Sequence, residues 1–314
     1  FITKGILQGV YQRMVNIQAR FSGIVVLISV KSCWRTTMKK LYELLNQNEV
    51  KGMFGVEIEC EGVNLPFPPP VRWRGENDGS LRGVFPHTKC EYVFKAPVSY
   101  ALAVKNIENL NNSFERNRSV LNFSFRTSTH VHINVQDLTW GEYLAFIYTA
   151  LLMENVLSRF CGEERENNRF CLRLQDAESF SNNLDRLFGG EVGDLFDISN
   201  EDLRYSFINL AATPKYGSLE FRGMRGTTDV EVLKVWLKAL HNMKMFAKRV
   251  GSPCDVHDFL VEKHPSDFAK AVLRDVFEQL DFPELSKEVQ RSFSLSLSLP
   301  YIYRRSNPIQ EILL

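Results

Sequence analysis

The fold is decided first by Phe54–Glu61, FGVEIECE, in which apolar and acidic side chains alternate. Successive side chains of a β-strand point to opposite faces of the sheet. This stretch therefore predicts a strand with one apolar face and one carboxylate face. Glu57 and Glu59 lie on the carboxylate face.

Two later stretches repeat this alternation. Thr129–Val135, THVHINV, separates branched apolar residues from two histidines and an asparagine. Leu219–Arg222, LEFR, separates Leu and Phe from Glu and Arg. Together the polar faces of the three predicted strands present Glu57, Glu59, His130, His132, Asn134, Glu220 and Arg222.

Helices are predicted between and after these strands, without a regular β-α-β alternation. Capping boxes, Thr139 with Glu142 and Thr228 with Glu231, predict two long helices. The order of elements favours an α+β fold, an antiparallel β-sheet with flanking helices. Further periodic segments predict strands at Ser80–Phe85, Glu91–Ala96 and Arg204–Ala211, and helices at Ser99–Asn112 and between Pro265 and Pro283; Ser292–Leu299, alternating Ser and Leu, fits a two-faced strand or a biased segment.

Composition narrows the class of protein. The 314 residues are 44% apolar and 24% charged, as in ordinary globular proteins. The net charge of +1 gives no bulk attraction to nucleic acid or to an anionic membrane. Six scattered cysteines without a C-x-x-C pair favour a cytoplasmic location, in a bacterium or in a host cell if the protein is viral. The longest apolar run, Gly23–Val30, is too short to span a membrane.

The clustered Glu and His side chains suggest a metal site. Carboxylates at i and i+2 repel each other, and a divalent cation would relieve this repulsion. Two His with Glu220 would be a legitimate zinc-hydrolase site. Several Glu with a retained Arg suit magnesium and phosphate better. A binding module without catalysis is a third reading, in which the polar face holds only an anion or a partner.

The motifs that carry these residues resemble a known family when they are read in order. The chain is similar to the family of putative amidoligases, within the carboxylate–amine ligase superfamily of glutamine synthetase and glutamate–cysteine ligase. The similarity covers about Met53–Lys248, and the family occurs widely in bacteria and phages. The motifs are Phe54–Glu59, Asp78-Gly79-Ser80-Leu81, Glu91 followed by Ala96-Pro97, His130–Asn134, Asn209-Leu210 and Leu219–Gly223.

The resemblance implies a curved antiparallel β-sheet in a glutamine-synthetase-like catalytic fold, and a role for each residue that matches. Arg222 would brace the transferring phosphoryl group and contact ATP, with Arg225 as a second catalytic candidate. His132 would contact the nucleotide. Asp78, Ser80, Asn134 and Asn209 are further candidates. The implied metal ligands are Glu57, Glu59, Glu91, His130 and Glu220.

The implied reaction is ATP-dependent formation of an amide bond through an acyl phosphate, with two or three Mg²⁺ ions. The expected partners are small-molecule or peptide carboxylates and amines, not nucleic acid. Residues 51–250 are expected to form the catalytic domain, and residues 251–314 a C-terminal helical region and tail. Residues 1–50 are predicted to be an N-terminal extension, non-native before Met38, because Met38-Lys39-Lys40-Leu41 resembles a natural start.

Overall fold

The computed structural model describes residues 39–85, 87–173, 176, 178–190, 192–197 and 205–297, all within the compact unit Thr36–Leu314. The segment predicted to be non-native before Met38 lies outside the described residues. So does the tail after residue 297.

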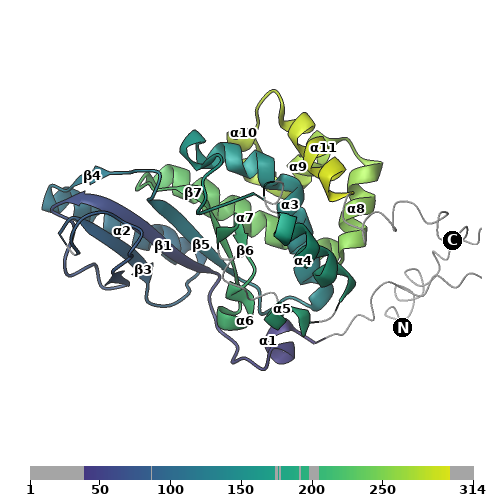
Figure 1. Ribbon diagram of the computed structural model, residues 1–314, viewed down its shortest axis with the longest axis horizontal. Coiled ribbons are helices and arrows are strands. Elements are labelled where there is room, and N and C mark those ends of the chain that lie inside the picture. The colour runs from purple at the N-terminus through teal and green to yellow at the C-terminus, as the bar shows by residue number, and fades with distance from the viewer. Residues whose placement is uncertain are drawn as a thin grey trace, which may run out of the picture. The chain divides into compact units, whose positions relative to one another are not determined.

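A seven-stranded antiparallel β-sheet is the centre of the described fold (Figure 1). The strand order is β2–β3–β1–β5–β7–β6, and β4 pairs with β1 beside this path. The three strands with polar faces, β1, β5 and β7, are therefore consecutive neighbours, and the predicted antiparallel α+β class is confirmed. The strands are β1 (Phe54–Val63), β2 (Trp73–Glu76), β3 (Lys89–Phe94), β4 (Val120–Asn122), β5 (Ser128–Asn134), β6 (Ile208–Asn209) and β7 (Ser218–Arg225).

Helices cover the apolar face of this sheet. α2 packs on β1, α7 on β5 and α3 on β7, while α8, α9 and α11 pack against α3 or α7. Phe54, Val56 and Ile58 of β1 are at most 1% exposed beneath them. The helices are α1 (Leu41–Leu44), α2 (Tyr100–Asn117), α3 (Trp140–Cys161), α4 (Glu178–Gly189), α5 (Asp194–Asp197), α6 (Ala212–Tyr216), α7 (Val230–Val250), α8 (Pro253–Glu262), α9 (Pro265–Leu273), α10 (Phe277–Leu280) and α11 (Leu285–Ser296), with short 3₁₀ turns η1 (Glu163–Arg165) and η4 (Arg274–Val276).

Helix α3 is a core helix. Its 22 residues have a mean hydropathy of 1.3 over the most apolar stretch, which would suit a membrane span, yet 89% of that stretch is buried inside the protein. Its predicted capping box is confirmed. Glu142 N donates to Thr139 Oγ1 at 3.3 Å, and Thr139 N donates to Glu142 Oε2 at 2.7 Å.

The predicted strand Ser80–Phe85 is wrong, because this segment is a loop of turns and bends. Its backbone groups bond to side chains instead of to a neighbouring strand. Arg82 N donates to Glu61 Oε1 at 2.7 Å, and Lys89 Nζ donates to the Leu81 carbonyl at 3.3 Å. Gly83 has φ +99°, which strongly favours glycine and departs from strand geometry.

The Ser–Leu alternation near the C-terminus is helical where the structure describes it. Ser292 and Ser296 lie in α11 and are 6% and 2% exposed. Leu285 and Val289 share their buried face at helical spacing, and Ser296 Oγ lies 3.1 Å from the Tyr148 hydroxyl of α3. Burial against α3 therefore outweighs the period-two pattern, and the two-faced strand is wrong for residues 292–296.

Two predicted boundaries also shift. Asp229, rather than Thr228, caps α7, and its Oδ1 accepts hydrogen bonds from two N–H groups of the first turn. Of the predicted strand Arg204–Ala211, only Ile208–Asn209 pairs with β7. The chain turns at Leu210 and enters α6, while Arg204 lies outside the described residues.

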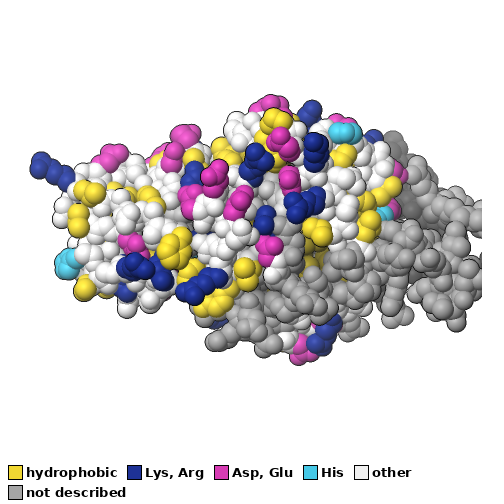
Figure 2. Space-filling view, turned by 45° about the horizontal axis from the view of Figure 1, so that its top comes forward, with side chains coloured by type: hydrophobic (Ala, Val, Ile, Leu, Met, Phe, Trp, Pro, Cys, Tyr) yellow, Lys and Arg dark blue, Asp and Glu magenta, His cyan; other side chains and the backbone are white. Residues whose placement is uncertain are grey.

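The surface carries mixed charge. Figure 2 shows Lys and Arg side chains interspersed with Asp and Glu over the face in view, without a large single-sign patch among the described side chains there. This agrees with the net charge of +1.

Candidate active site

The polar faces of β1, β3, β5 and β7 meet on the side of the sheet opposite the helices. Register fixes the encounters: Glu57 lies opposite His130, Glu59 opposite Glu91, and His132 opposite Glu220. Directly opposed residues of an antiparallel pair share a face of the sheet. The carboxylate–histidine cluster is defined as Glu57, Glu59, Glu91, His130, His132 and Glu220.

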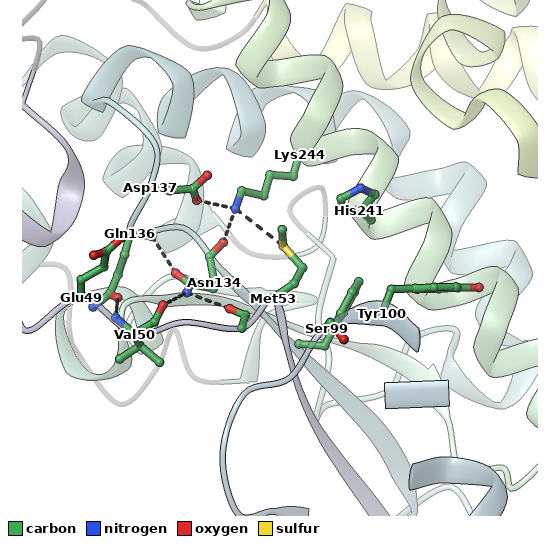
Figure 3. A pocket seen from close by; sticks show the side chains of 12 residues that line it. Glu49, Val50, Met53, Ser99, Tyr100, Asn134, Gln136, Asp137, His241 and Lys244 are labelled. Atoms are coloured by element: carbon green, nitrogen blue, oxygen red, sulfur yellow. Dashed lines mark hydrogen bonds and ion pairs between the residues drawn. The ribbon is translucent and has the colours of Figure 1, made fainter. Parts of the chain in front are cut away.

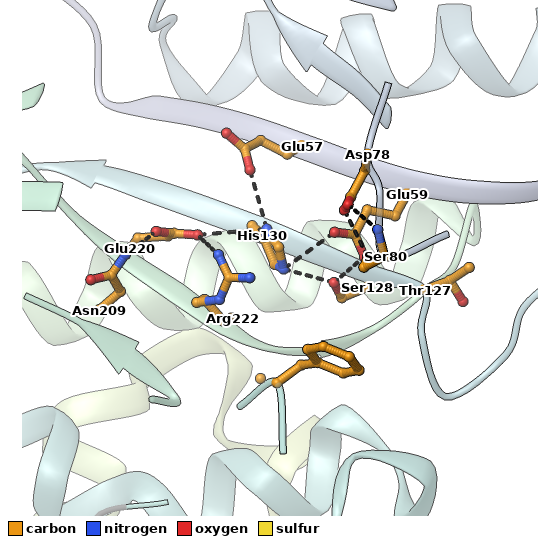
Figure 4. A network of polar contacts seen from close by, with 12 residues as sticks. Glu57, Glu59, Asp78, Ser80, Thr127, Ser128, His130, Asn209, Glu220 and Arg222 are labelled. Carbon is orange, nitrogen blue, oxygen red and sulfur yellow. Dashed lines mark hydrogen bonds and ion pairs between the residues drawn. The ribbon is translucent and has the colours of Figure 1, made fainter. Parts of the chain in front are cut away.

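His130 is at the centre of this cluster (Figure 4). Its Nδ1 lies 3.1 Å from Glu57 Oε2 and 3.5 Å from Glu220 Oε1, and its Nε2 lies 3.9 Å from Glu59 Oε1. Glu57 also reaches the second imidazole, since its Oε1 lies 3.3 Å from His132 Nε2. One carboxylate therefore links the two histidines.

Burial makes the ionised forms of these side chains energetically unfavourable. Glu59, His130 and Glu220 are only 3%, 2% and 4% exposed. An ionised carboxylate removed from water needs a nearby positive charge or several hydrogen-bond donors. The cluster is thus built as a ligand site or as a strongly compensated ion network, and its electrostatics distinguish these two cases.

Two of the carboxylates are stabilised as anions. Burial alone would raise the pKa of Glu57, but hydrogen bonds from His130 and His132 hold it well below its usual value. The pKa of Glu220 is likewise lowered against burial, chiefly by the Arg222 charge and then by the two histidines. The hydrogen bond with Glu57 and the charge of Glu220 raise the pKa of His132 in spite of its burial.

The remaining acids lack such compensation. Burial raises the pKa of Glu59, with too little relief from His130 and Ser128 to reverse it. Burial, followed by the charges of Glu57, Glu59 and Asp78, raises the pKa of Glu91 to about 9. The protein's own cations therefore do not neutralise this end of the cluster.

Three overlapping groups of donor atoms in the cluster could hold a cation, each with its donor atoms within 4.8 Å of one another. Glu59, Asp78 and Glu91 offer oxygen alone, the donor that Mg²⁺ prefers. The other two groups each include one imidazole, a donor that suits transition metals as well. They are Glu57, His132 and Glu220, and Glu57, Glu91 and His130.

Asp78 and Ser80 reach the cluster from the loop between β2 and β3. Ser80 N and Ser80 Oγ donate to the two oxygens of Asp78 at 2.6 and 2.9 Å. These bonds lower the pKa of Asp78 against its partial burial. Arg126 Nη1 holds the loop by donating to the Ser80 carbonyl at 3.0 Å.

Arg222 supplies a fixed cation. Its Nη1 donates to Glu220 Oε1 at 2.5 Å, while its Nε is buried without a hydrogen-bond partner among the described residues. Burial would lower its pKa, but Glu220 and Glu59 raise it, so the guanidinium stays charged. Asn209 Nδ2 donates to the other Glu220 oxygen at 2.6 Å, which leaves Glu220 held from both sides.

A bulge in β7 determines where Arg222 lies. Thr129 pairs with Met224 and Val131 with Phe221, so two residues of β7 oppose His130 alone. The buried Arg165 holds the bulge by donating to the Arg222 carbonyl at 2.9 Å and to the Gly223 carbonyl at 3.2 Å. The motifs of the sequence did not identify Arg165.

Two predicted site residues lie apart from the cluster. Asn134 donates to the carbonyls of Val50 and Gly52 at 2.7 and 2.9 Å and so holds the chain that enters β1. Arg225 Nη1 donates to the Phe160 and Cys161 carbonyls at the end of α3, at 3.1 and 3.2 Å. These contacts with backbone carbonyls indicate a structural role for both residues.

Sequence reasoning missed two serines. Ser128 Oγ makes a short contact with Glu59 Oε2 and lies 2.7 Å from His130 Nε2. Ser218 Oγ lies 3.0 Å from His132 Nδ1. Ser128 is two residues before His130, so the alternation that selected the histidines could have selected this serine as well.

A separate cavity of about 400 Å³ lies where β1 begins and β5 ends, beside α7 (Figure 3). Lys244 and Asp137 line it, together with Met53, Tyr100 and His241. Its lining includes no member of the carboxylate–histidine cluster. The Lys244 cluster is defined as Lys244, Lys248 and Asp137 with the Asn134 carbonyl.

Residues 89–242 match the model of a family described as "Putative amidoligase enzyme". This segment, which carries Glu91, both histidines, Glu220 and Arg222, is similar to the amidoligase family. The family predicted from the motifs is thereby confirmed, and it implies a ligase-type enzyme that forms amide bonds. Glu57, Glu59 and Asp78 precede the matched segment, and register and contacts bring them to it. A search of curated proteins found no match.

Proposed function

We propose that the protein is an ATP- and Mg²⁺-dependent carboxylate–amine ligase that forms a peptide or isopeptide bond through an acyl phosphate. The observation that carries the proposal is a buried excess of carboxylates beside Arg222, whose Nε has no hydrogen-bond partner in the part of the chain that the structure describes. A polyphosphate that arrives with divalent cations would complement both features. The glutamine-synthetase-like form of the fold is part of this proposal.

The chemistry needs activation because a carboxylate is a poor electrophile. A substrate carboxylate oxygen attacks the γ-phosphorus of ATP, and ADP leaves. The amine nitrogen then attacks the acyl carbon, the C–O bond to phosphate breaks, and the nitrogen loses a proton. Phosphoryl transfer depends mainly on positioning and charge stabilisation, so no nucleophilic side chain is required.

In this scheme Arg222 donates from its free Nε to the transferring phosphoryl group. Glu220 holds the guanidinium in place, and Asn209 in turn holds Glu220 through its other oxygen. Glu59, Asp78 and Glu91 would hold Mg²⁺, since their donor set is all oxygen. Glu57, His130 and Glu220 would be the further ligands, and His132 would contact the nucleotide or a cation. When bound, Mg²⁺ would neutralise part of the negative charge on the phosphates.

The imidazoles keep a zinc hydrolase as the alternative, because two of the three donor groups contain one. That alternative requires His130, His132 and Glu220 around one ion. Among the described residues, however, the two histidines fall in different donor groups. This arrangement favours the ligase.

The test is ADP release by the full chain with ATP and Mg²⁺ across a panel of amines and carboxylates. Glu57→Gln keeps the shape but removes a charge that serves two donor groups, and turnover is expected to fall at least about 100-fold. The matched control is Glu61→Gln. Glu61 is on the same face of β1, outside the donor groups, and a glutamine oxygen can still accept from Arg82 N.

The control variant is expected to keep turnover within about twofold, since it loses no hydrogen bond. Absence of ATP and Mg²⁺ binding by the wild type would refute the ligase. Stoichiometric Zn²⁺ with ATP-independent hydrolysis would support the hydrolase. Binding of ATP without turnover on any substrate pair would favour a binding module.

A further inference from the structure

In each imidazole of the cluster, one ring nitrogen lies within hydrogen-bonding distance of a carboxylate and the other within that distance of a serine hydroxyl. His130 has Glu57 and Glu220 at Nδ1 and Ser128 at Nε2. His132 has Glu57 at Nε2 and Ser218 at Nδ1. The two rings thus have opposite nitrogens turned toward the shared carboxylate.

The position of the hydrogen on the imidazole ring decides which nitrogen of a histidine can bind a cation. The nitrogen that binds a cation gives its lone pair, so in the neutral ring the other nitrogen carries the hydrogen and needs an acceptor. Histidine ligands almost always donate that second N–H to a carboxylate, carbonyl or water. A serine oxygen accepts in the same way.

Ser128 meets this requirement at His130. Its Oγ lies 2.7 Å from Nε2, so when a cation takes the place of the hydrogen between Nδ1 and Glu57, Ser128 can accept the Nε2–H bond and leave the Nδ1 lone pair to the cation. The serine's own hydrogen can then be donated to Glu59 Oε2, with which it makes the short contact. Ser128 is 2% exposed, so water is poorly placed to replace it.

Ser218 does the same for His132 with the ring reversed. Its Oγ, 3.0 Å from Nδ1, can accept the Nδ1–H bond and leave the Nε2 lone pair facing Glu57. Ser218 is 7% exposed, and it belongs to β7, the strand that also carries Glu220. The imidazole of His132 is thereby turned toward the donor group it shares with Glu57 and Glu220.

We propose that Ser128 and Ser218 are positioning residues, which hold His130 by Nε2 and His132 by Nδ1 so that the opposite nitrogens face divalent cations in the donor groups containing Glu57. This rests on the metal-binding part of the proposed function and extends it, because neither serine belongs to a donor group. It also gives His132 a place at a cation, beyond the nucleotide contact implied by family resemblance.

The experiment uses Mn²⁺ as the probe on the full chain, with free Mn²⁺ followed by electron paramagnetic resonance. Ser128→Ala and Ser218→Ala are each expected to weaken binding about 10–100-fold, the usual cost of losing such a partner. Pulsed measurements should detect imidazole ¹⁴N coupling to bound Mn²⁺ in the wild type and a weakened coupling in both variants.

Ser296→Ala is the matched control. Ser296 is as buried as Ser128 and is also hydrogen-bonded, but its partner is Tyr148 in α3. It is expected to bind Mn²⁺ as the wild type does. Ser128→Thr and Ser218→Thr retain the hydroxyl and should recover most of the affinity and the ¹⁴N coupling.

The possible results separate the two levels of the proposal. A wild type that binds no Mn²⁺ overturns both the metal site and the role of the serines. A wild type that binds Mn²⁺ without ¹⁴N coupling, or serine variants that match the wild type, overturns the role of the serines alone. If Ser128→Ala does not fold by circular dichroism, Ser218→Ala and the two threonine variants decide the question.

Discussion

The carboxylate–histidine cluster and the Lys244 cluster are two regions of buried charge in one molecule, and they are compensated differently. Lys244 is 1% exposed, but its Nζ lies 2.5 Å from Asp137 Oδ1 and 2.7 Å from the Asn134 carbonyl oxygen (Figure 3). Lys248 Nζ lies 2.8 Å from the other Asp137 oxygen. Each charge there has an oppositely charged partner, although burial still lowers the pKa of Lys244 against the effect of Asp137.

In and beside the carboxylate–histidine cluster, the described residues do not fully compensate the buried charges and hydrogen-bond donors. Burial raises the pKa of Glu59, and burial with the neighbouring carboxylates raises that of Glu91. Arg222 Nε is a buried donor without an acceptor among the described residues. Uncompensated groups of this kind cost stability unless a ligand satisfies them. The difference teaches that burial of charge alone does not mark an active site, whereas a buried group of carboxylates in excess of the cations around it is a stronger indication of one.

The largest expected effect concerns the cation of the carboxylate–histidine cluster. Arg222→Ala should lower turnover about 100–1000-fold, because it removes a donor directed at the transferring phosphoryl group. Arg225→Ala should lower turnover no more than about threefold, since its side chain donates to the end of α3. Steady-state kinetics on folded protein measures both, and a larger effect at Arg225 would contradict the assignment.

The next effect is expected at Lys244. Lys244→Met should lower the free energy of unfolding by about 3 kcal/mol, because it removes a buried cation with two oxygen partners. Turnover of the folded fraction at low temperature should stay within about twofold, since no cluster member is touched. Urea denaturation followed by activity assays tests this. A strong loss of turnover at unchanged stability would show that the Lys244 cluster contributes to the activity of the carboxylate–histidine cluster.

A smaller, pH-dependent effect is expected at Glu91. Its pKa is raised from 4.5 to about 9, so between these values the folded protein holds a proton that the unfolded chain has lost. Stability of the metal-free protein therefore falls as pH rises through this window. Glu91→Gln removes that loss and should raise the free energy of unfolding by about 1–3 kcal/mol at pH 8, with almost no gain at pH 4.5.

Denaturation of both proteins at several pH values in chelator measures the Glu91 effect. Equal stability differences at pH 4.5 and 8 would mean that Glu91 is ionised in the fold. The same variant should lose Mg²⁺ affinity, because it removes one oxygen anion from two donor groups.

The smallest effect is expected at Lys248, the outer partner of Asp137. Its side chain is 36% exposed, so Lys248→Met should cost at most about 1 kcal/mol of unfolding free energy. Salt should reduce the contribution of Lys248 more than that of buried Lys244. A cost at Lys248 equal to that at Lys244 would show that exposure does not separate the two cations.

Sequence reasoning predicted the central strands because each carries its pattern locally. Glu57, His130 and Glu220 were selected by alternation within their own strands, and they meet. The prediction failed at Ser80–Phe85, where backbone groups bond to side chains from distant parts of the chain. It failed again at Ser292 and Ser296, whose burial against α3 is a tertiary effect.

Asn134 and Arg225 show the limit of the same reasoning. Both are near the end of a strand with a polar face, yet their side chains bind carbonyls at the sheet margin. The alternation along a strand predicts the face of the sheet on which a side chain lies. It does not predict which group the end of that side chain contacts. Ser128 and Ser218 are the converse case, because an unremarkable serine gains a role only from the imidazole beside it.

The sequence by itself determined that Glu, His and Arg side chains share one face of an antiparallel sheet, because side-chain direction alternates with a period of two along any strand. Only the tertiary structure decided which of them meet. Strand order, register and the bulge opposite His130 are set by pairing between distant segments, as are the arrival of Asp78 from its loop and the two serines behind the imidazoles. Such pairing depends on how the whole chain packs, so no single stretch encodes it.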